Sequence, residues 1–311
     1  MRHGSKLVLI LFGNHQALRN MPSIALIKTA FREWVTRERS PRLPEPDLIM
    51  DDPEQVASYV RAGLEDGVMA PVYLFHCANI CEVIRPGDTV LDLACGPANQ
   101  LAMAARLNPA THFIGVDLSE PMLQQAGERV AQQQLRNVSL RHGDITTLTE
   151  FPNASVDAVI STMALHHLPD EHVLKRAFAE VARVLKPGGG VYLADFGHLK
   201  AERSILYFAY QYQDRQPELF TRDYLNSLRA AFALQDFRQA AGPLVQHARL
   251  YSTFIMPYMV AIKSPARQPG NLALTIQLKK LREALPVWHQ ADFRHLSAIF
   301  RLGGLDCSLM R

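Results

Sequence analysis

The sequence predicts an α/β protein with a doubly wound, mostly parallel seven-stranded sheet, a helical lid before the sheet and a helical tail after it. Three observations predict this fold. Apolar segments alternate with amphipathic ones between residues 89 and 194. The apolar segments are continuous, as in strands that are buried on both faces of a parallel sheet. After Phe196 the remaining strand-like segments have no crossover helix between them, which suggests an antiparallel pair at the sheet edge.

The composition is that of an ordinary globular protein. The chain has 311 residues, of which 48% are hydrophobic and 20% are charged, so a large core is expected. A net charge of +3, without a stripe of Lys and Arg, gives no reason to expect a nucleic-acid partner. The four cysteines have no CxxC spacing, which favours a reducing, cytoplasmic location over a disulfide framework. No apolar stretch is long enough to span a bilayer.

The changes of pattern along the chain predict four parts. They are residues 1–50, a leader, helix and linker; residues 51–85, a helical lid; residues 86–264, the sheet domain; and residues 265–311, a helical tail. Helical spacing in the flanking parts predicts helices over residues 24–38, 53–63, 69–84, 272–285 and 293–302. The linker over residues 40–55 is rich in proline and acidic residues.

Within the sheet domain each element follows from its pattern. Strands are predicted over residues 89–94, 112–116, 138–141, 156–161 and 190–194. The helices between them are predicted over residues 100–107, 121–134 and 171–185. Beyond the last parallel strand, we expect helices over residues 202–213 and 222–231 and strands over residues 234–240 and 254–262.

The junction after the first strand, "VLDLACGPANQ" (residues 90–100), indicates a ligand site. In open α/β sheets a ligand lies past the carboxyl ends of the strands, at the point where the strand order reverses. Gly96 allows close approach to the backbone, while Ala94 and Ala98 keep the surface low. The helix that follows offers free N–H groups and a positive partial charge. A bound ligand is therefore expected to lie against this turn.

The next two strand ends carry groups suited to an adenine nucleoside. Asp117 ends the second strand, where a carboxylate can accept hydrogen bonds from both hydroxyls of a ribose. Asp144, after the third strand, can accept from an exocyclic amine, and Ile145 can pack on a purine. The turn has one glycine and is not GxGxxG, so a dinucleotide fits poorly.

Five segments in this order and spacing resemble the class I S-adenosylmethionine-dependent methyltransferases, which have a Rossmann-like fold. They are "VLDLACGPANQ", "FIGVDLSEPML", "RHGDITTL", "VDAVISTMALHHLPD" and "LKPGGGVYLADF". The resemblance covers residues 89–196 strongly and residues 234–262 weakly. The run from "LHHLPD" to "EVARVLKPGG" is most similar to the small-molecule branch that includes ubiquinone and menaquinone biosynthesis methyltransferases.

By position, the resemblance implies S-adenosylmethionine as cofactor and a set of residues that would bind it. They are Asp92, Ala94, Cys95 and Gly96 at the methionine moiety, Asp117 and Leu118 at the ribose and adenine, Asp144 and Ile145 at the adenine, and Ser161, Thr162 and Met163 as the floor. The chain departs from the family pattern at Ala94 and Ala98, where glycines are common.

The acceptor side is less defined by the sequence. His166 and His167 follow the fourth strand, and either could act as a general base, although both could simply pack beneath the cofactor. The candidates for contact with the acceptor are Asp195 and His198 after the fifth strand, Tyr207 and Tyr210 on the next helix, and Tyr73 and His76 before the domain. Core packing is the alternative for the aromatic ones. No carboxylate cluster is evident beside the acceptor, so no metal is expected.

The expected function is transfer of a methyl group from S-adenosylmethionine to a small or medium organic acceptor, on an O, N or C atom. The acceptor is the expected partner, and a homodimer is possible. One alternative is a protein substrate. A second is a non-catalytic protein that binds the cofactor or acts as a scaffold. A nicotinamide dehydrogenase is disfavoured by the missing glycines.

Overall fold

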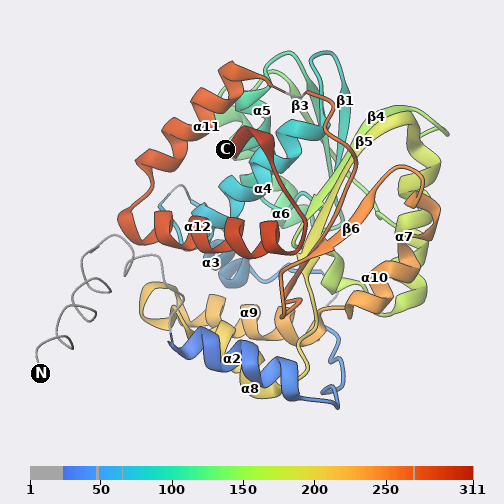
Figure 1. The fold of residues 1–311 in the computed structure, drawn as a ribbon. Coiled ribbons are helices and arrows are strands. Elements are labelled where there is room, and N and C mark those ends of the chain that lie inside the picture. Colours follow the sequence, from blue (N-terminus) through green and yellow to red (C-terminus); the bar gives the residue numbers. More distant parts are fainter. Residues whose placement is uncertain (1–23, 47–48, 65, 269, 311) are drawn as a thin grey trace, which may run out of the picture.

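The computed structural model describes residues 24–46, 49–64, 66–268 and 270–310 (Figure 1). The leader expected at the start of the chain lies largely outside these residues. The helices are as follows: α2 (Ile24–Val35), α3 (Pro53–Ala62), α4 (Ala70–Val83), α5 (Asn99–Leu107), α6 (Glu120–Gln132), α7 (Glu171–Val184), α8 (Glu202–Tyr210), α9 (Glu218–Ala230), α10 (Leu234–Ala240), α11 (Leu272–Ala284) and α12 (Val287–Leu302). None of the described helices combines the length and the apolar character that crossing a membrane requires.

A seven-stranded sheet in the order β3-β2-β1-β4-β5-β7-β6 forms the centre of the fold. The strands are β1 (Thr89–Leu93), β2 (His112–Asp117), β3 (Val138–His142), β4 (Val156–Thr162), β5 (Leu185–Phe196), β6 (Arg249–Ser252) and β7 (Met259–Lys263). β1 to β5 pair in parallel, and β7 pairs antiparallel with both β5 and β6. The predicted fold class is therefore confirmed.

Helices bury both faces of the sheet, which explains why its strands are continuously apolar. α7 and α10 cover one face, and α4 lies on the other with α11 and α12 outside it (Figure 1). α4 is apolar nearly all round and almost wholly buried, as expected of a helix enclosed between a sheet and an outer layer. The tail of the chain thus completes the layer over α4.

The pattern of the last strands was interpreted wrongly at one point. Residues 234–240 form α10, not a strand, and the antiparallel pair is β6 with β7. Leu234, Phe237 and Ala240 recur at the three-residue spacing of a helix face, and the last two are buried. The Asp236 side chain accepts a hydrogen bond from the Ala233 N–H at 2.8 Å, which caps the helix start. A short apolar segment fits both patterns, and tertiary packing decides between them.

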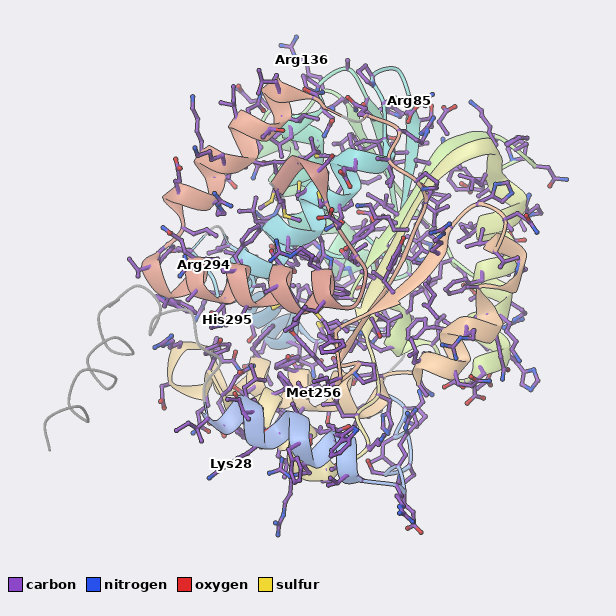
Figure 2. All side chains as sticks on the ribbon, in the orientation of Figure 1. Lys28, Arg85, Arg136, Met256, Arg294 and His295 are labelled. Carbon is purple, nitrogen blue, oxygen red and sulfur yellow. The ribbon has the colours of Figure 1, made fainter. Side chains whose placement is uncertain are left out.

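The N-terminal helix α2 is fixed by a buried acid. Both carboxylate oxygens of Glu33 accept backbone N–H bonds just before α8, from Lys200 at 2.8 Å and from Ala201 at 3.0 Å. These N–H groups would otherwise be free at a helix start. Lys28, on the other side of α2, points away from the body of the protein (Figure 2). This anchor sets where the chain leaves α2 toward the ligand-binding end of the sheet.

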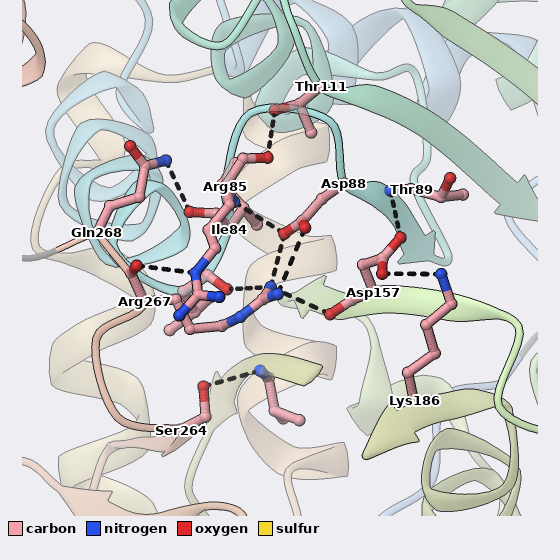
Figure 3. Close-up of polar contacts among 12 residues, drawn as sticks. Ile84, Arg85, Asp88, Thr89, Thr111, Asp157, Lys186, Ser264, Arg267 and Gln268 are labelled. Atoms are coloured by element: carbon pink, nitrogen blue, oxygen red, sulfur yellow. Dashed lines mark hydrogen bonds and ion pairs between the residues drawn. The ribbon is translucent and has the colours of Figure 1, made fainter. Parts of the chain in front are cut away.

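A polar network joins the tail to the amino-terminal edge of the sheet (Figure 3). The Arg267 guanidinium forms an ion pair with Asp88 at 2.6 Å and donates to the Asp157 carbonyl at 3.1 Å. The Ser264 hydroxyl accepts from the Val191 N–H at 3.0 Å. The side chains of Arg267 and Asp88 are only 13% and 9% exposed, so water competes little for the pair.

Replacing Arg267 with methionine is expected to lower the free energy of unfolding by about 3 kcal/mol, because it leaves the Asp88 carboxylate buried without its cation. Chemical denaturation followed by circular dichroism measures this difference. The control is Arg85→Met, since Arg85 is exposed and, within the described part of the chain, its side chain donates to a single acceptor, the Arg267 carbonyl. Equal losses in the two variants would contradict a buried ion pair at Arg267.

Candidate active site

A cavity of about 240 Å³ opens at the carboxyl ends of β1, β2, β3 and β4. β1 lies between β2 and β4, so this is the point where the strand order reverses and where α/β sheets bind ligands. The predicted residues that line it are Ala94, Gly96, Asp117, Leu118, Asp144, Ile145, Met163 and His167. The structure therefore brings together residues from all four strand ends named by the sequence analysis.

The turn after β1 has an alternating left-handed backbone. Ala94, Gly96 and Ala98 have φ values of 53°, 53° and 58°. This conformation costs a residue with a Cβ roughly 1–2 kcal/mol, whereas glycine adopts it freely. Apart from its two chain neighbours, no described residue has an atom within 4 Å of the Cβ position that a side chain at Gly96 would take. The turn thus presents bare backbone to the cavity, as the short side chains predicted.

Asp117 links the first two strand ends. Its carboxylate accepts the Gly96 N–H at 2.7 Å and the Ser119 N–H at 2.9 Å, one on each oxygen. Burial raises the pKa of this carboxyl above its usual range, while the two N–H bonds act in the opposite direction. Each oxygen can still accept a further hydrogen bond, because a carboxylate has about four acceptor positions. Asp117 is thus held in place with capacity left for a ligand.

Asp92 lies deeper, inside β1, and does not line the cavity. It is 3% exposed, and burial raises its pKa well above the usual range, with the Asp117 charge adding to the effect. No described residue forms an ion pair with it. Three other predicted residues, Cys95, Ser161 and Thr162, do not line the cavity either. The Ser161 hydroxyl donates to the Leu93 carbonyl at 2.9 Å, which ties β4 to β1.

The third strand end forms an apolar slot with one acid. One Asp144 oxygen accepts the Thr146 N–H at 2.7 Å, which fixes the turn. Ile145 is buried, and Leu118 and Met122 lie along the same cavity. Such a slot can hold a planar heterocycle between aliphatic side chains, with Asp144 at its polar edge.

The segment between α2 and α3 closes one side of the cavity. Ile49 and Met50 of this segment line it, and Tyr59 lines it from α3. The Ser119 hydroxyl is bonded to the Met50 carbonyl at 3.0 Å and to the Asp51 carboxylate at 2.8 Å. The sequence analysis missed these residues because no motif marks a linker that folds back over a distant site. The proline-rich composition showed only that the segment is extended.

The two histidines after β4 occupy different positions. His166 is buried, and its Nδ1 donates to Asp195 Oδ1 at 2.7 Å, while its backbone N–H donates to the other oxygen at 2.7 Å. Burial alone would lower the pKa of His166, but the Asp195 carboxylate outweighs it and raises that pKa. His167 lines the cavity, and burial together with the His166 charge lowers its pKa to about 3. Only His167 is directly accessible from the cavity.

Residues 40–46, which we call the strap, cross behind this histidine pair. The Arg42 guanidinium donates to the carbonyls of Leu168 at 2.6 Å and Ala230 at 2.7 Å, and lies 3.9 Å from the Phe232 ring centre. The strap thereby places Glu45 beside the imidazoles, where burial raises the pKa of its carboxyl. No sequence pattern points to Glu45, because it lies far along the chain from either histidine.

Several predicted acceptor residues lie elsewhere. His76 is fully buried and shares a hydrogen bond of 2.7 Å with the Tyr192 hydroxyl, because this face of α4 packs on β5. His198 donates to the Ser40 carbonyl at 2.8 Å and so holds the strap. Tyr73, Tyr207 and Tyr210 do not line the cavity, although the Tyr73 hydroxyl lies 3.4 Å from that of Tyr59, which does. Asp195 also lies outside the cavity lining, where its carboxylate accepts two hydrogen bonds from His166.

The sequence of this chain is similar to those of known methyltransferases over the segment that contains the strand ends of the cavity. Residues 90–189 match the family described as "Methyltransferase domain". The chain is 40% identical over 107 residues to demethylmenaquinone methyltransferase of Listeria monocytogenes serotype 4a, and 39% identical over 113 residues to arsenite methyltransferase of Halobacterium salinarum. These alignments cover 34% and 36% of this chain, and 44% and 28% of the relatives, so the chain matches less than half of their length.

A solved structure shares the fold over most of the chain. The plantazolicin methyltransferase BpumL, solved in complex with SAH, aligns with 85% of this chain and 92% of its own, with a TM-score of 0.50 and 12% identity. At that identity the likeness concerns the fold alone. Together with the strand order, it shows a fold of the class I methyltransferase type, in which residues 90–189 match the methyltransferase domain family.

Proposed function

We propose that this protein transfers a methyl group from S-adenosylmethionine to a small organic acceptor. The observation that carries the proposal is Asp117. It ends β2, is fixed by the Gly96 and Ser119 N–H groups, and faces a cavity lined mostly by residues of the matched methyltransferase segment. The relatives align over less than half of their length. The proposal for the whole protein's activity therefore rests on the geometry of this site and not on the activities of the relatives.

The residues present fit the cofactor. Asp117 would accept hydrogen bonds from the ribose hydroxyls, and the slot beside Ile145 would hold the adenine with Asp144 at its amino group. The bare turn at Gly96 leaves room for the amino-acid tail. Asp92 lies deeper than the cavity lining and has no ion-pair partner among the described residues, so the ammonium of that tail, bound at the turn, would favour its charged form.

Bound S-adenosylmethionine supplies an electrophilic methyl group on a sulfonium. The protein's contribution is positioning and exclusion of water, because the leaving group is already good. Met163 and Leu168 give the cavity an apolar wall, and the linker residues Ile49 and Met50 close it on the other side. We expect the acceptor to enter beside His167, a polar lining residue that directly precedes Leu168 in the chain.

The first test measures cofactor binding and turnover with the whole chain. Calorimetric titration of S-adenosylmethionine is expected to give micromolar binding. Incubation with a panel of phenols, carboxylic acids and amines is expected to release S-adenosylhomocysteine with at least one acceptor, as detected by mass spectrometry. Absence of cofactor binding would overturn the proposal. Binding without release for any acceptor would favour a non-catalytic cofactor-binding protein, and preferential binding of a nicotinamide dinucleotide would favour a dehydrogenase.

A further inference from the structure

Glu45, His166 and His167 form a cluster beside the cofactor cavity. One ligand-type atom of each residue lies within 4.8 Å of those of the other two. Two imidazoles and one carboxylate are a donor set used by catalytic zinc and non-haem iron sites, where three protein ligands leave positions open. The cluster spans the strap and the loop after β4, so only the fold brings it together.

Asp195 orients the cluster from behind. Its carboxylate accepts the His166 Nδ1–H at 2.7 Å, the His166 backbone N–H at 2.7 Å and the Phe196 backbone N–H at 2.7 Å. With Nδ1 engaged as a donor, Nε2 is the nitrogen of His166 that can bind a cation. A carboxylate on the far nitrogen of a histidine is the usual support of a metal-binding imidazole. Asp195 is fully buried, so this support is rigid.

The other two members of the cluster, His167 and Glu45, each have a ligand atom that is available to bind a metal ion. His167 Nδ1 is buried and has no hydrogen-bond partner within the described part of the chain. An unpaired buried ring nitrogen is unfavourable unless a ligand satisfies it. Glu45 is half-buried, and one of its oxygens accepts the Ser227 hydroxyl at 2.9 Å, which leaves the other oxygen available.

We propose that Glu45, His166 and His167 bind one divalent transition-metal ion, such as Zn²⁺, Co²⁺ or Fe²⁺, at the acceptor side of the cavity. Nitrogen ligands favour these ions over Mg²⁺ and Ca²⁺, which take oxygen. Ligand atoms around such an ion lie roughly 3 to 3.5 Å apart, since each is about 2.1 Å from it. The cluster therefore contracts on binding, and the Glu45 side chain on the strap is the member that can move.

The open side of the cluster faces the cavity, because His167 lines it together with Ala164 and Leu168. This points to an acceptor with a hydroxyl group, such as a phenol or an enol, methylated on oxygen; this part rests on the proposed function. In that reaction the hydroxyl proton leaves to solvent and an oxygen lone pair forms the new bond to the methyl carbon. The carbon–sulfur bond breaks, and its electron pair stays on sulfur.

Cobalt is the probe, because its visible absorption reports the ligand set without requiring activity. The tag-free full-length chain is treated with chelator, dialysed and titrated with Co²⁺, and bound metal is counted by mass spectrometry. We expect one ion per chain. Glu45→Gln and His167→Ala are each expected to weaken Co²⁺ binding at least about 30-fold, and Asp195→Asn, a positioning variant, about 10- to 100-fold. The control His172→Ala, an exposed histidine on α7, is expected to bind like wild type.

Two results overturn the metal site. They are no Co²⁺ uptake by the wild type, or uptake that is unchanged in both Glu45→Gln and His167→Ala. Calorimetry of S-adenosylmethionine on the same samples separates this failure from failure of the cofactor site, since Glu45 lies outside the cavity lining. Catechol is expected to shift the Co²⁺ spectrum of the wild type. A spectrum that catechol leaves unchanged overturns the assignment of a hydroxyl-bearing acceptor.

Discussion

Asp117→Ala is expected to weaken binding of S-adenosylmethionine by about 100-fold. The substitution removes the acceptor proposed for both ribose hydroxyls and frees the Gly96 and Ser119 N–H groups from their partner. A hydrogen bond to a charged group contributes roughly 1.5–3 kcal/mol, so losing two such bonds costs about 3 kcal/mol, which is a factor of about 100 in Kd. Calorimetric titration of the cofactor into both proteins measures the difference.

The matched control is Glu128→Ala. Glu128 is an exposed carboxylate on the next helix, α6. Among the described residues its side chain bonds with those of Gln124 and Gln125, and it does not line the cavity. We expect cofactor binding within twofold of wild type for this variant. If Asp117→Ala, folded as judged by circular dichroism, also bound like wild type, the ribose could not lie at the end of β2 and the proposed cofactor orientation would be wrong.

Gly190→Ala is expected to destabilise the protein by several kcal/mol, on the order of 3–5. A Cβ at Gly190 would lie 1.9 Å from the Val83 carbonyl oxygen, where α4 ends against β5, and 3.3 Å from the Ala158 Cβ. The nearer obstacle is backbone, so no side-chain rotation relieves it. Denaturant unfolding measures the loss, and a large part of the expressed variant is expected to be insoluble.

Gly188→Ala separates packing from backbone conformation at nearly the same place. Gly188 has a φ of +72°, and among the described residues none beyond its chain neighbours has an atom within 4 Å of its added Cβ. The expected cost is only the left-handed strain, about 1–2 kcal/mol. Similar losses in the two variants would contradict the close contact between α4 and β5, and with it the burial of α4 beneath the tail helices.

The strand ends that line the cavity were predictable because their signals are local. Each parallel strand is a continuous apolar segment, and the residues that follow it are read directly from the chain. Parallel strands bring their carboxyl ends to one edge, so Gly96, Asp117 and Asp144 could be expected to meet there without knowledge of their contacts. The error at residues 234–240 arose where the segment was too short for its period to separate a helix from a strand.

The sequence by itself determined the parallel sheet, the switch point and the nucleoside-type residues around it. These follow from hydrophobic period and from turn chemistry, which act within a few residues. Only the tertiary structure decided that Arg42 holds the strap, that Glu45 meets His166 and His167, and that His76 lies in the core. Such contacts join residues distant along the chain. They depend on packing and on hydrogen bonds to backbone carbonyls, which every residue carries and which leave no pattern in the sequence.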